Sequence, residues 1–583
     1  MLNAPKPLGA SSAAALLAAS LLLPATAAQA QSPSPSTTGS PTSTTAVPQL
    51  HWSRCPAAQP GDPSLDGYQC ATMTAPLDYA NPTGRTIKLG LVKHLAGGSA
   101  KPLGTLFYNP GGPGGLGSVF LPAGIDGFGP DVLSTFDIVS WDPRGMGGLS
   151  SPTVQCFDTE DQEGALLSST SFPPLTSAQQ QQWTSAYGQL FQACAGRDDE
   201  LLTHVSTADN ARDLDLMRQA VGEDKLFYYG TSYGTFLGAT YANMFPSNVQ
   251  RMILDGAVDP TAWADNTSPL STFVRAGSDL STAAVVQDFL RLCGNSTTQQ
   301  CAFSAGTPDA TSAKFQTLLT RAGQQPLVVD PSQPGVTDSD LVALMTNSLY
   351  VVRPVPGFSA FPGWTGLATQ LQALWQAGTT SPAPSGTAPG TQSPAEAQSP
   401  TGPQSPAGAQ SPTGAQSPTG PQSAGGGSTG AGGSAAPQPY HGVEQQLAVI
   451  CGESPNPATV SAAIDQAQTS LRRAGTVSQN WPWTAYCVNW PAKAASSYLG
   501  PWNKVDTPIV VVGTTGDPAT PYGDAQAVAK LLPGARLVTV NGYGHTELFN
   551  PSSCAQAFLS GYLTGGTLPP DGASCSQNAQ PFR

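Results

Sequence analysis

One serine of this chain stands where a nucleophile can be bent out of the backbone. Gly230-Thr-Ser-Tyr-Gly234 closes a strand-like run at 225–229 and opens a helix-like run at 236–244. A Gly-x-Ser-x-Gly turn in that setting exposes the serine hydroxyl for attack on a carbonyl carbon. We therefore predict that Ser232 is a catalytic nucleophile. Ser428 lies in a similar pentapeptide, but a Gly/Ser/Pro tract surrounds it, and such a tract is typical of a linker.

A serine hydroxyl needs an imidazole to accept its proton and an acid to orient that imidazole. We predict His545 as the base, because it follows the last strand-like run and comes after Ser232 in the chain. The other histidines are His51, His94 and His204, which precede the serine, and His441, which adjoins the Gly/Ser/Pro tract. The predicted acid is Asp517, at the tip of the strand-like run 510–516. Asp255, at the end of the preceding strand-like run, remains its competitor.

The negative oxygen that forms during acyl transfer needs two backbone N–H donors. Tyr233, directly after the predicted nucleophile, is expected to supply the first donor. The second is expected from the glycine-rich loop 110–115, with Gly111 preferred and Gly112 as second choice. Glycines let the backbone approach a substrate without side-chain obstruction. A phosphate-binding role is disfavoured, because no Gly-Lys-Ser/Thr follows.

The elements that must position these residues are visible as apolar runs of strand length. They span 86–92, 104–109, 137–141, 226–229, 251–254, 508–513 and 536–540. Continuous runs of Val, Ile, Leu, Phe and Tyr are typical of a sheet buried on both faces. Helical patterns lie between them, notably 208–221, which a Ser206-x-x-Asp209 capping box precedes. Alternating strands and helices predict a mostly parallel α/β sheet flanked by helices.

The strand pattern breaks after residue 259 and resumes at 508. Helical patterns occupy the interval, at 272–292, 338–350, 364–377, 443–450 and 457–474. We therefore predict a core formed by residues 49–259 and 506–583, with a helical lid, 260–505, inserted between two strands. Within the lid, 379–439 carries a Gln-Ser-Pro repeat whose composition is typical of a flexible linker.

The N-terminal residues are typical of an export signal. Lys6, the apolar run 13–23 and the small residues Ala28-Gln-Ala30 predict a signal peptide at 1–30. Residues 31–48 are rich in Ser, Thr and Pro and are expected to form a disordered spacer. The apolar run is shorter than the roughly 20 residues that span a bilayer. We expect a secreted, extracellular protein with no membrane span after signal cleavage, and its oligomeric state stays open.

Ten cysteines fit an oxidising compartment, where they form structural disulfides. Taking neighbours in the sequence, we expect the pairs Cys55–Cys70, Cys156–Cys194, Cys293–Cys301, Cys451–Cys487 and Cys554–Cys575, although sequence alone leaves connectivity open. No Cys-x-x-Cys or His-x-x-x-His pattern occurs, so we expect no metal site and no cofactor. The net charge of −13 argues against nucleic acid as a partner.

Five motifs along the chain point together to one family. They are Asn109-Pro-Gly-Gly-Pro-Gly-Gly115, Trp141-Asp-Pro-Arg-Gly-Met-Gly147, Gly230-Thr-Ser-Tyr-Gly234, Asp517-Pro-Ala-Thr-Pro521 and Gly544-His545. This set resembles the secreted tripeptidyl aminopeptidase family of α/β-hydrolases, which is related to the prolyl iminopeptidases. The likeness extends from about Trp52 to Cys575. Pro110 stands where the prolyl iminopeptidase loop, His-Gly-Gly-Pro-Gly, has its histidine.

The resemblance implies an α/β-hydrolase fold and an exopeptidase that releases short peptides from a free N-terminus, with the lid limiting access. A lid carboxylate would pair with the substrate's ammonium group. Glu453 is similar in place to an acidic position of the family, and Glu444 is the weaker option; a solvated surface carboxylate is the alternative for both. Trp490 is expected to line the substrate pocket, with buried core as its alternative. The repeat tract is longer than the family suggests, so product length stays open.

These observations, together with the resemblance, predict a secreted serine aminopeptidase that acts through an acyl-enzyme. The resemblance implies that it releases short peptides, tripeptides by expectation, from substrates with a free N-terminus. A carboxylic-ester hydrolase is the alternative, because the same three side chains serve both amides and esters. A catalytically silent exported binding protein is the alternative from another class.

Overall fold

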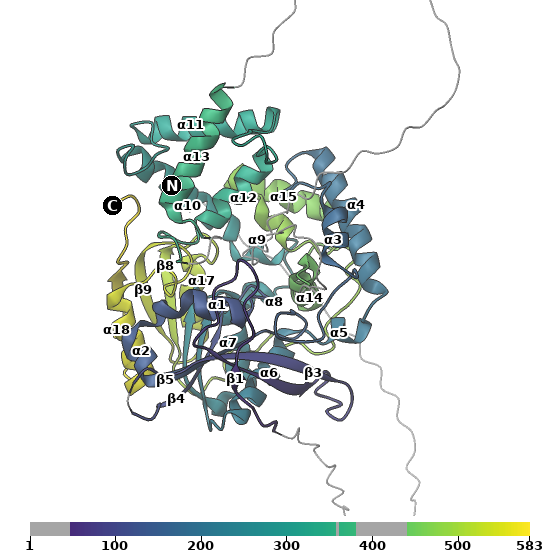
Figure 1. The fold of residues 1–583 in the computed structure, drawn as a ribbon, viewed down its shortest axis with the longest axis vertical. Helices are drawn as coiled ribbons and strands as arrows, with labels where there is room; N and C mark the ends of the chain where they lie inside the picture. Colours follow the sequence, from purple (N-terminus) through teal and green to yellow (C-terminus); the bar gives the residue numbers. More distant parts are fainter. Residues whose placement is uncertain (1–46, 99, 357–360, 381–439) are drawn as a thin grey trace, which may run out of the picture. The chain divides into compact units, whose positions relative to one another are not determined.

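A ten-stranded sheet forms the centre of the computed structural model, which describes residues 47–98, 100–356, 361–380 and 440–583 (Figure 1). Its strands run in the order β1-β2-β3-β5-β4-β6-β7-β8-β9-β10. They are β1 Ser53–Arg54, β2 Gln69–Pro76, β3 Thr86–His94, β4 Gly104–Asn109, β5 Phe136–Trp141, β6 Leu226–Thr231, β7 Val249–Asp255, β8 Val510–Gly516, β9 Arg536–Tyr543 and β10 Ser574–Ser576. Pairing is antiparallel from β1 through β3 to β5 and parallel from β5 to β10. The predicted mostly parallel α/β sheet is confirmed.

The central strands form because their side chains are apolar on both faces. All six residues of β6 are buried, and so are the first five residues of β8. Sequence analysis missed β1, β2 and β10. The longest of these, β2, consists largely of Cys, Ala and Thr, so its apolar pattern is weak. It is held by antiparallel pairing with β3, from Gln69 opposite Lys93 to Pro76 opposite Thr86.

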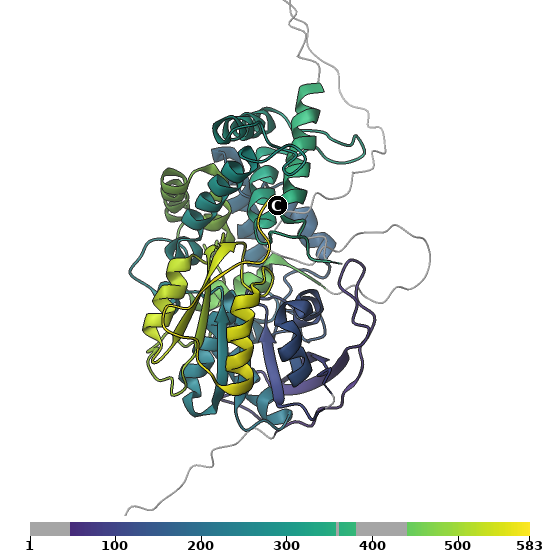
Figure 2. The same ribbon diagram turned by 90° about the vertical axis from the view of Figure 1, so that its left-hand side faces the viewer.

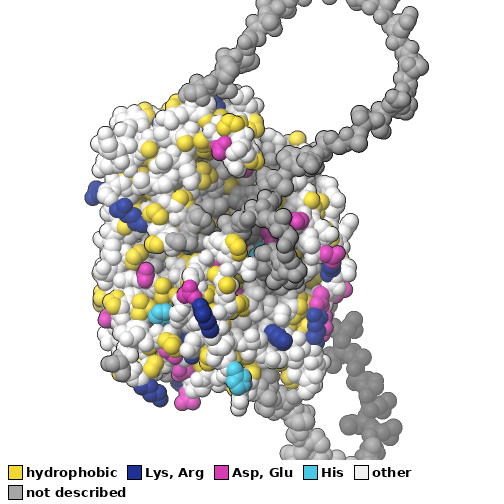
Figure 3. Space-filling model, in the orientation of Figure 1, with side chains coloured by type: hydrophobic (Ala, Val, Ile, Leu, Met, Phe, Trp, Pro, Cys, Tyr) yellow, Lys and Arg dark blue, Asp and Glu magenta, His cyan; other side chains and the backbone are white. Residues whose placement is uncertain are grey.

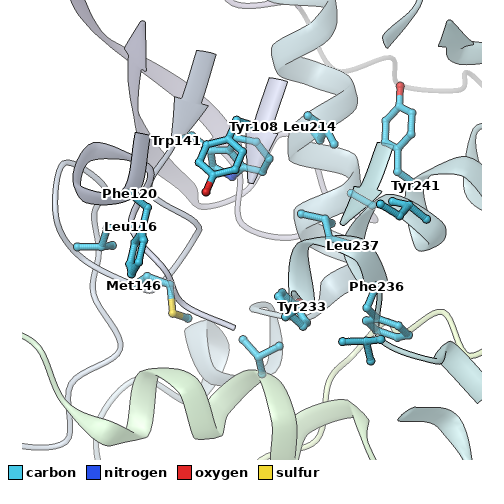
Figure 4. Packing of buried hydrophobic residues seen from close by; sticks show 14 of the residues in the cluster. Tyr108, Leu116, Phe120, Trp141, Met146, Leu214, Tyr233, Phe236, Leu237 and Tyr241 are labelled. Carbon is cyan, nitrogen blue, oxygen red and sulfur yellow. The ribbon is translucent and has the colours of Figure 1, made fainter. Parts of the chain in front are cut away.

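Helices cover the faces of the sheet (Figures 1 and 2). Those around the sheet are α1 Gly117–Gly124, α2 Gly129–Thr135, α6 Thr207–Ala220, α7 Tyr233–Met244, α17 Tyr522–Leu531 and α18 Ser553–Gly565. The predicted cap of α6 is present, because the Ser206 hydroxyl accepts the Asp209 N–H at 3.1 Å. Figure 4 shows side chains of α7, among them Tyr233, Phe236 and Leu237, in the buried cluster that joins this helix to its neighbours.

Residues 256–509, between β7 and β8, contribute no strand to the sheet within their described ranges; we call them the helical segment. Their helices are α8 Pro260–Ala264, α9 Thr272–Ala276, α10 Ser278–Gly294, α11 Pro308–Gln324, α12 Asp338–Ser348, α13 Gly363–Thr380, α14 Val443–Glu453, α15 Val460–Ala474 and α16 Asn480–Thr484. The single helix predicted at 272–292 is wrong at one point. Gly277 adopts a left-handed conformation (φ +85°), which ends α9 and starts α10 in a new direction.

The helical segment contacts the loops at the carboxyl ends of the strands. Tyr350 O accepts the backbone N–H of His545 at 2.7 Å, and Val352 N–H donates to Asn550 Oδ1 at 2.9 Å. Thr282 Oγ1 donates to Pro518 O at 2.6 Å. The segment also has an apolar core of its own, which includes Phe289. The loops after β8 and β9 are therefore fixed from the helical side as well as from the sheet.

Five disulfides join the described residues, and they are the five predicted pairs. Another three helices precede β6: α3 Glu160–Leu167, α4 Ser177–Ala195 and α5 Asp199–Thr203. The bridge Cys156–Cys194 ties the loop before α3 to the end of α4. Within the described ranges no helix has the length and apolarity to cross a membrane. The predicted signal peptide lies outside the described residues, as does most of the spacer and of the low-complexity linker.

Candidate active site

Ser232 lies in a sharp turn between β6 and α7. Its backbone has φ +56° and ψ −128°, a conformation that L-residues adopt only under strain. The turn is tightly enclosed: a Cβ added to Gly234 would lie 2.5 Å from Asn109 O. The Ser232 N–H donates to Asp255 O at 3.0 Å, which holds the turn against β7. The glycines of the Gly-x-Ser-x-Gly motif are thus required by close backbone packing, and the serine side chain faces a cavity.

His545 and Asp517 are joined by a short hydrogen-bonded contact. Nδ1 of His545 lies 2.9 Å from Asp517 Oδ2 and 3.0 Å from Oδ1. Oδ1 also accepts the N–H groups of Ala519 and Thr520, and Oδ2 accepts Thr520 Oγ1–H at 2.9 Å. These donors fix the carboxylate, which in turn fixes the imidazole with Nδ1 toward Asp517. Nε2 is left as the ring nitrogen free to act on another group.

Asp255, the competing acid, has a different position. Its oxygens accept the N–H groups of Glu547 and Leu548 at 2.8 and 3.0 Å and the Tyr229 hydroxyl at 3.1 Å. Burial raises the pKa of Asp255 to about 6. Asp255 therefore supports the backbone just after His545, whereas Asp517 contacts the imidazole itself. Of the two acids that the sequence left open, only Asp517 has the geometry of an orienting group.

Ser232 and His545 line the same cavity, which has a volume of about 160 Å³. Nε2 of His545 is buried and has no hydrogen-bond partner among the described residues. Gly256 lies beside the imidazole, because an added Cβ would lie 3.3 Å from His545 Cε1. The preceding residue, Asp255, accepts the Ser232 N–H. A serine hydroxyl turns about χ1, and such contacts often tighten only when substrate binds.

Two residues that line the cavity with Ser232 have a backbone N–H group without a hydrogen-bond partner among the described residues. Tyr233 is the first residue of α7, so its N–H has no intrahelical acceptor. The Gly111 N–H donates to Asn109 Oδ1 at 3.1 Å, whereas the Gly112 N–H makes no hydrogen bond to any described residue. In this structure a neighbouring side chain therefore occupies the N–H of Gly111, the residue preferred on the sequence. Gly112 and Tyr233 are the available pair.

Aromatic side chains form much of the rest of the cavity wall. They are Phe120, Phe172, Trp263, Phe273, Tyr350, Phe361, Trp481 and Phe549. Tyr350 also packs edge-on against the His545 ring, with centroids 4.9 Å apart. Sequence analysis identified none of these wall residues, because scattered aromatics in helices carry the same pattern as ordinary core. It also missed Asp524, which lines the cavity near the start of α17. Acidic residues are common in the first turn of a helix, so its sequence context did not indicate a functional role.

The predicted contact between Glu453 and a substrate is not supported. Glu453 is 7% exposed and does not line the cavity. Its oxygens accept the N–H and hydroxyl of Thr207 at 2.9 and 2.5 Å and the Trp263 indole N–H at 3.2 Å. Burial raises its pKa to about 7. Glu444, the weaker option, is also buried and accepts the Tyr440 hydroxyl at 2.6 Å. Protein donors thus occupy both carboxylates.

Trp490 also lies away from the cavity. Its side chain is 8% exposed and packs edge-on against Phe191, with centroids 5.1 Å apart. Because it is not among the residues that line the cavity, the expected role in the substrate pocket is wrong, and the alternative of buried core describes it.

The arrangement has the parts needed for acyl transfer. A strained serine, an imidazole oriented by a carboxylate and two unpaired N–H groups meet at one cavity. Within the described ranges, no cluster of three His, Cys, Asp or Glu side chains is placed to hold a metal ion.

Comparisons with known proteins agree with this geometry. A family model described as alpha/beta hydrolase fold matches residues 104–314, and one described as TAP-like protein matches 474–575. The chain is 28% identical to "Serine protease Hip1" of Mycobacterium tuberculosis, over 90% of this chain and 91% of the relative. "Tripeptidyl aminopeptidase" of Streptomyces coelicolor is 27% identical, over 88% and 84%. "Carboxylesterase B" of M. tuberculosis is 28% identical, over 91% and 90%. The predicted resemblance is confirmed.

Proposed function

Because this chain is a hydrolase of the α/β-hydrolase fold with a TAP-like C-terminal part, we propose that it is a secreted serine aminopeptidase. It releases short peptides, tripeptides by our prediction, from substrates with a free N-terminus. The observation that carries the proposal is the His545–Asp517 contact, which leaves Nε2 without a partner at the cavity that Ser232 lines. The name of the S. coelicolor relative supports the substrate class.

We assign each step of the reaction to a residue of the cavity. Ser232 Oγ attacks the peptide carbonyl carbon while His545 Nε2 takes its proton. Asp517 stabilises the imidazolium that forms. The N–H groups of Tyr233 and Gly112 bind the negative oxygen of the tetrahedral intermediate. His545 then returns the proton to the leaving amine, and a water molecule, activated by the same imidazole, hydrolyses the acyl-enzyme.

The helical segment contributes part of the cavity wall. Its aromatic side chains enclose the cavity, and its backbone holds His545 through Tyr350 O. We propose that the segment acts as a lid that admits the end of a peptide and excludes the middle of a folded chain. The five disulfides are compatible with export.

The experiment uses three substrates: a tripeptidyl chromogenic amide with a free amino group, its N-acetylated form and a simple acyl ester. Wild-type protein is expected to cleave the free-amine amide and to discriminate against the acetylated one, and Ser232→Ala is expected to cleave none of them. Turnover retained in Ser232→Ala would remove the nucleophile assignment. Equal use of the acetylated and free amides would remove the aminopeptidase assignment.

A carboxylic-ester hydrolase is the second candidate, because the cavity wall is largely aromatic and one relative is named carboxylesterase B. Preference for the acyl ester over both amides would favour it. Failure of a fluorophosphonate probe to label Ser232 would favour the third candidate, a silent binding protein.

A further inference from the structure

One acidic side chain faces the cavity without a cation of its own. Among the described residues that line the cavity, Asp524 alone carries a carboxyl group, and none is Lys or Arg. Charged residues make up 10% of the chain, and they are sparse over the face in Figure 3. Burial lowers the pKa of His441, another titratable residue of the wall.

The chain provides little compensation for this carboxyl group. Asp524 is the third residue of α17 and is 9% exposed. Its Oδ2 accepts the Asp259 N–H at 3.4 Å, a long hydrogen bond. Burial, together with the nearby charges of Asp259 and Asp517, raises the pKa of Asp524 to about 8. A carboxyl group in this position lacks a positive partner, and a cation placed beside it would lower its pKa again.

Several other buried aspartates of the chain are paired with an arginine. Arg144 contacts Asp213 at 2.6 Å, and both side chains are fully buried. Asp255 has no cation either, but its oxygens accept three hydrogen bonds. None of the described Lys or Arg residues forms an ion pair with Asp524, and its side chain accepts only the long hydrogen bond from Asp259. At the cavity that Ser232 and His545 line, the missing partner can come from a substrate.

We propose that Asp524 binds the positively charged amino group at the N-terminus of the substrate and so sets the preference for free N-termini. This inference rests on the proposed aminopeptidase function and names the residue that recognises the free N-terminus. An ammonium group fits because it carries the missing charge and donates hydrogen bonds to both carboxylate oxygens. Partial burial strengthens the attraction. An acetylated N-terminus supplies no charge and leaves the carboxyl group uncompensated. Asp524 thus takes the role that the sequence suggested for Glu453.

A purely structural role for Asp524 makes a different prediction. An acidic residue in the first turn of a helix stabilises that helix through its dipole. Loss of such a role would lower stability, or displace the Asp517 loop just before α17, and would reduce the rate for every substrate alike. Loss of an ammonium-binding role would affect only substrates with a free amino group.

The test is Asp524→Asn, assayed on a free-amine tripeptidyl amide, its N-acetylated form and a neutral acyl ester. We expect kcat/KM for the free-amine amide to fall roughly 10- to 100-fold, mainly through KM, as for loss of a hydrogen bond to a charged group. For the ester, kcat/KM should stay within about 2-fold of wild type, because the neutral ester has no amino group for Asp524 to bind. Asp259→Asn is the matched control: it removes a neighbouring carboxylate that does not line the cavity, and the ratio of free to acetylated rates should persist.

Asp524→Glu keeps the charge and is expected to restore part of the preference. If Asp524→Asn does not fold, as judged by its thermal unfolding, Asp524→Ser replaces it. A uniform loss on all three substrates, or an Asp524→Asn variant that still prefers the free amine, would overturn the inference while the aminopeptidase proposal stands. Wild-type protein that cleaves free and acetylated amides equally would overturn the proposed function itself.

Discussion

The cavity has two sides, which differ in whether backbone groups or aromatic side chains matter most. On the sheet side, the groups placed to act on a carbonyl depend on backbone geometry: the strained turn at Ser232, the unpaired N–H groups of Gly112 and Tyr233, and the loop that carries Asp517. On the helical side, the contacts are made by large aromatic side chains such as Phe273 and Trp481. Backbone geometry tolerates few substitutions, whereas an apolar wall can be formed by many combinations of residues.

Because of this difference, we expect changes on the two sides to affect different kinetic parameters. Changes to these sheet-side groups should reduce kcat for every substrate, because they act on the reacting carbonyl. Asp524 also lies on the sheet side, but its proposed contact is with the substrate's amino group, so its change should alter KM. Changes on the helical side should alter KM and the choice of substrate, because they affect groups that contact only the rest of the molecule. Four variants test whether the two sides divide in this way.

The largest effect is expected from Asp517→Asn. The amide that replaces the carboxylate cannot accept the Nδ1 proton with the same charge, so the imidazole loses its orientation and the stabilisation of its cationic form. In serine hydrolases with this triad, the corresponding change lowers kcat about 10⁴-fold. We expect a loss of that order on amide and ester alike, with KM nearly unchanged, in steady-state assays.

Asp255→Asn is the matched control for that change. It removes the other buried acid of this edge, which contacts the backbone of Glu547 and Leu548 and not the imidazole. We expect lower thermal stability and a loss of activity below about 10-fold. A larger loss of kcat from Asp255→Asn than from Asp517→Asn would reverse the assignment of the acid.

The next effect is expected from Gly111→Ala. The new Cβ would lie 2.5 Å from Thr231 O and 2.9 Å from Tyr233 N, so the glycine-rich loop must move away from the serine turn. Loss of one donor to the oxyanion lowers kcat about 10²- to 10³-fold. Gly164→Ala in α3 is the control, since a Cβ there meets nothing within 4 Å. Unchanged kcat in Gly111→Ala would show that the loop does not contribute to the oxyanion site.

The sequence predicted the sheet side well, and the reason is physical. Ser232, Asp517 and His545 each follow an apolar run of strand length, and the carboxyl ends of parallel strands meet at one edge of a sheet. Their order along the chain therefore gave their approximate positions. The choice between Gly111 and Gly112 did not follow, because it depends on the rotamer of Asn109, which no sequence pattern reports.

The helical side was predicted poorly for the opposite reason. Glu453 has the sequence context of an exposed helix end, yet it is buried under Trp263 and Thr207. Trp490 fits a pocket or a core equally well by type, and only tertiary packing decides. The break at Gly277 was missed because one glycine within a helical pattern is usually tolerated. Such features depend on contacts between residues distant in the sequence.

A smaller effect is expected from Phe273→Ala on the helical wall. Phe273 contacts Trp263 and Trp481 and lines the cavity, so its loss removes apolar surface from a bound side chain. About 1.5 kcal/mol of lost burial corresponds to a rise in KM of roughly 10-fold, with kcat little changed. Trp490→Phe, outside the cavity, should leave KM within about 2-fold. A fall in kcat that exceeds the rise in KM for Phe273→Ala would contradict the division between the two sides.

The smallest effect is expected on stability, from two glutamates that lie behind the part of the cavity wall formed by the helical segment. Glu163 of α3 and Glu444 of α14 face each other beside Gly442, a residue of the cavity wall. Burial and repulsion from Glu444 raise the pKa of Glu163 above its ordinary value, and burial raises the pKa of Glu444 as well. The folded protein therefore keeps protons that the unfolded chain releases at lower pH. Stability from this pair is complete below the unfolded pKa of about 4.3 and decreases as pH rises through the neutral range.

Glu163→Gln removes the part of that pH dependence that comes from Glu163. In the wild type, Glu163 Oε1 accepts the Val443 N–H at 2.9 Å, and the glutamine oxygen can accept it in the same way. The glutamine NH2 group can donate to Glu444 Oε2, which has no hydrogen-bond partner among the described residues. We expect about 1 kcal/mol of added stability at pH 8 and none at pH 4, measured by thermal unfolding across pH. Asp161→Asn, an exposed carboxylate of the same helix, should leave the pH profile unchanged. A Glu163→Gln variant that is less stable than wild type at pH 8 would mean that the ionised pair is stabilising, which would contradict this expectation.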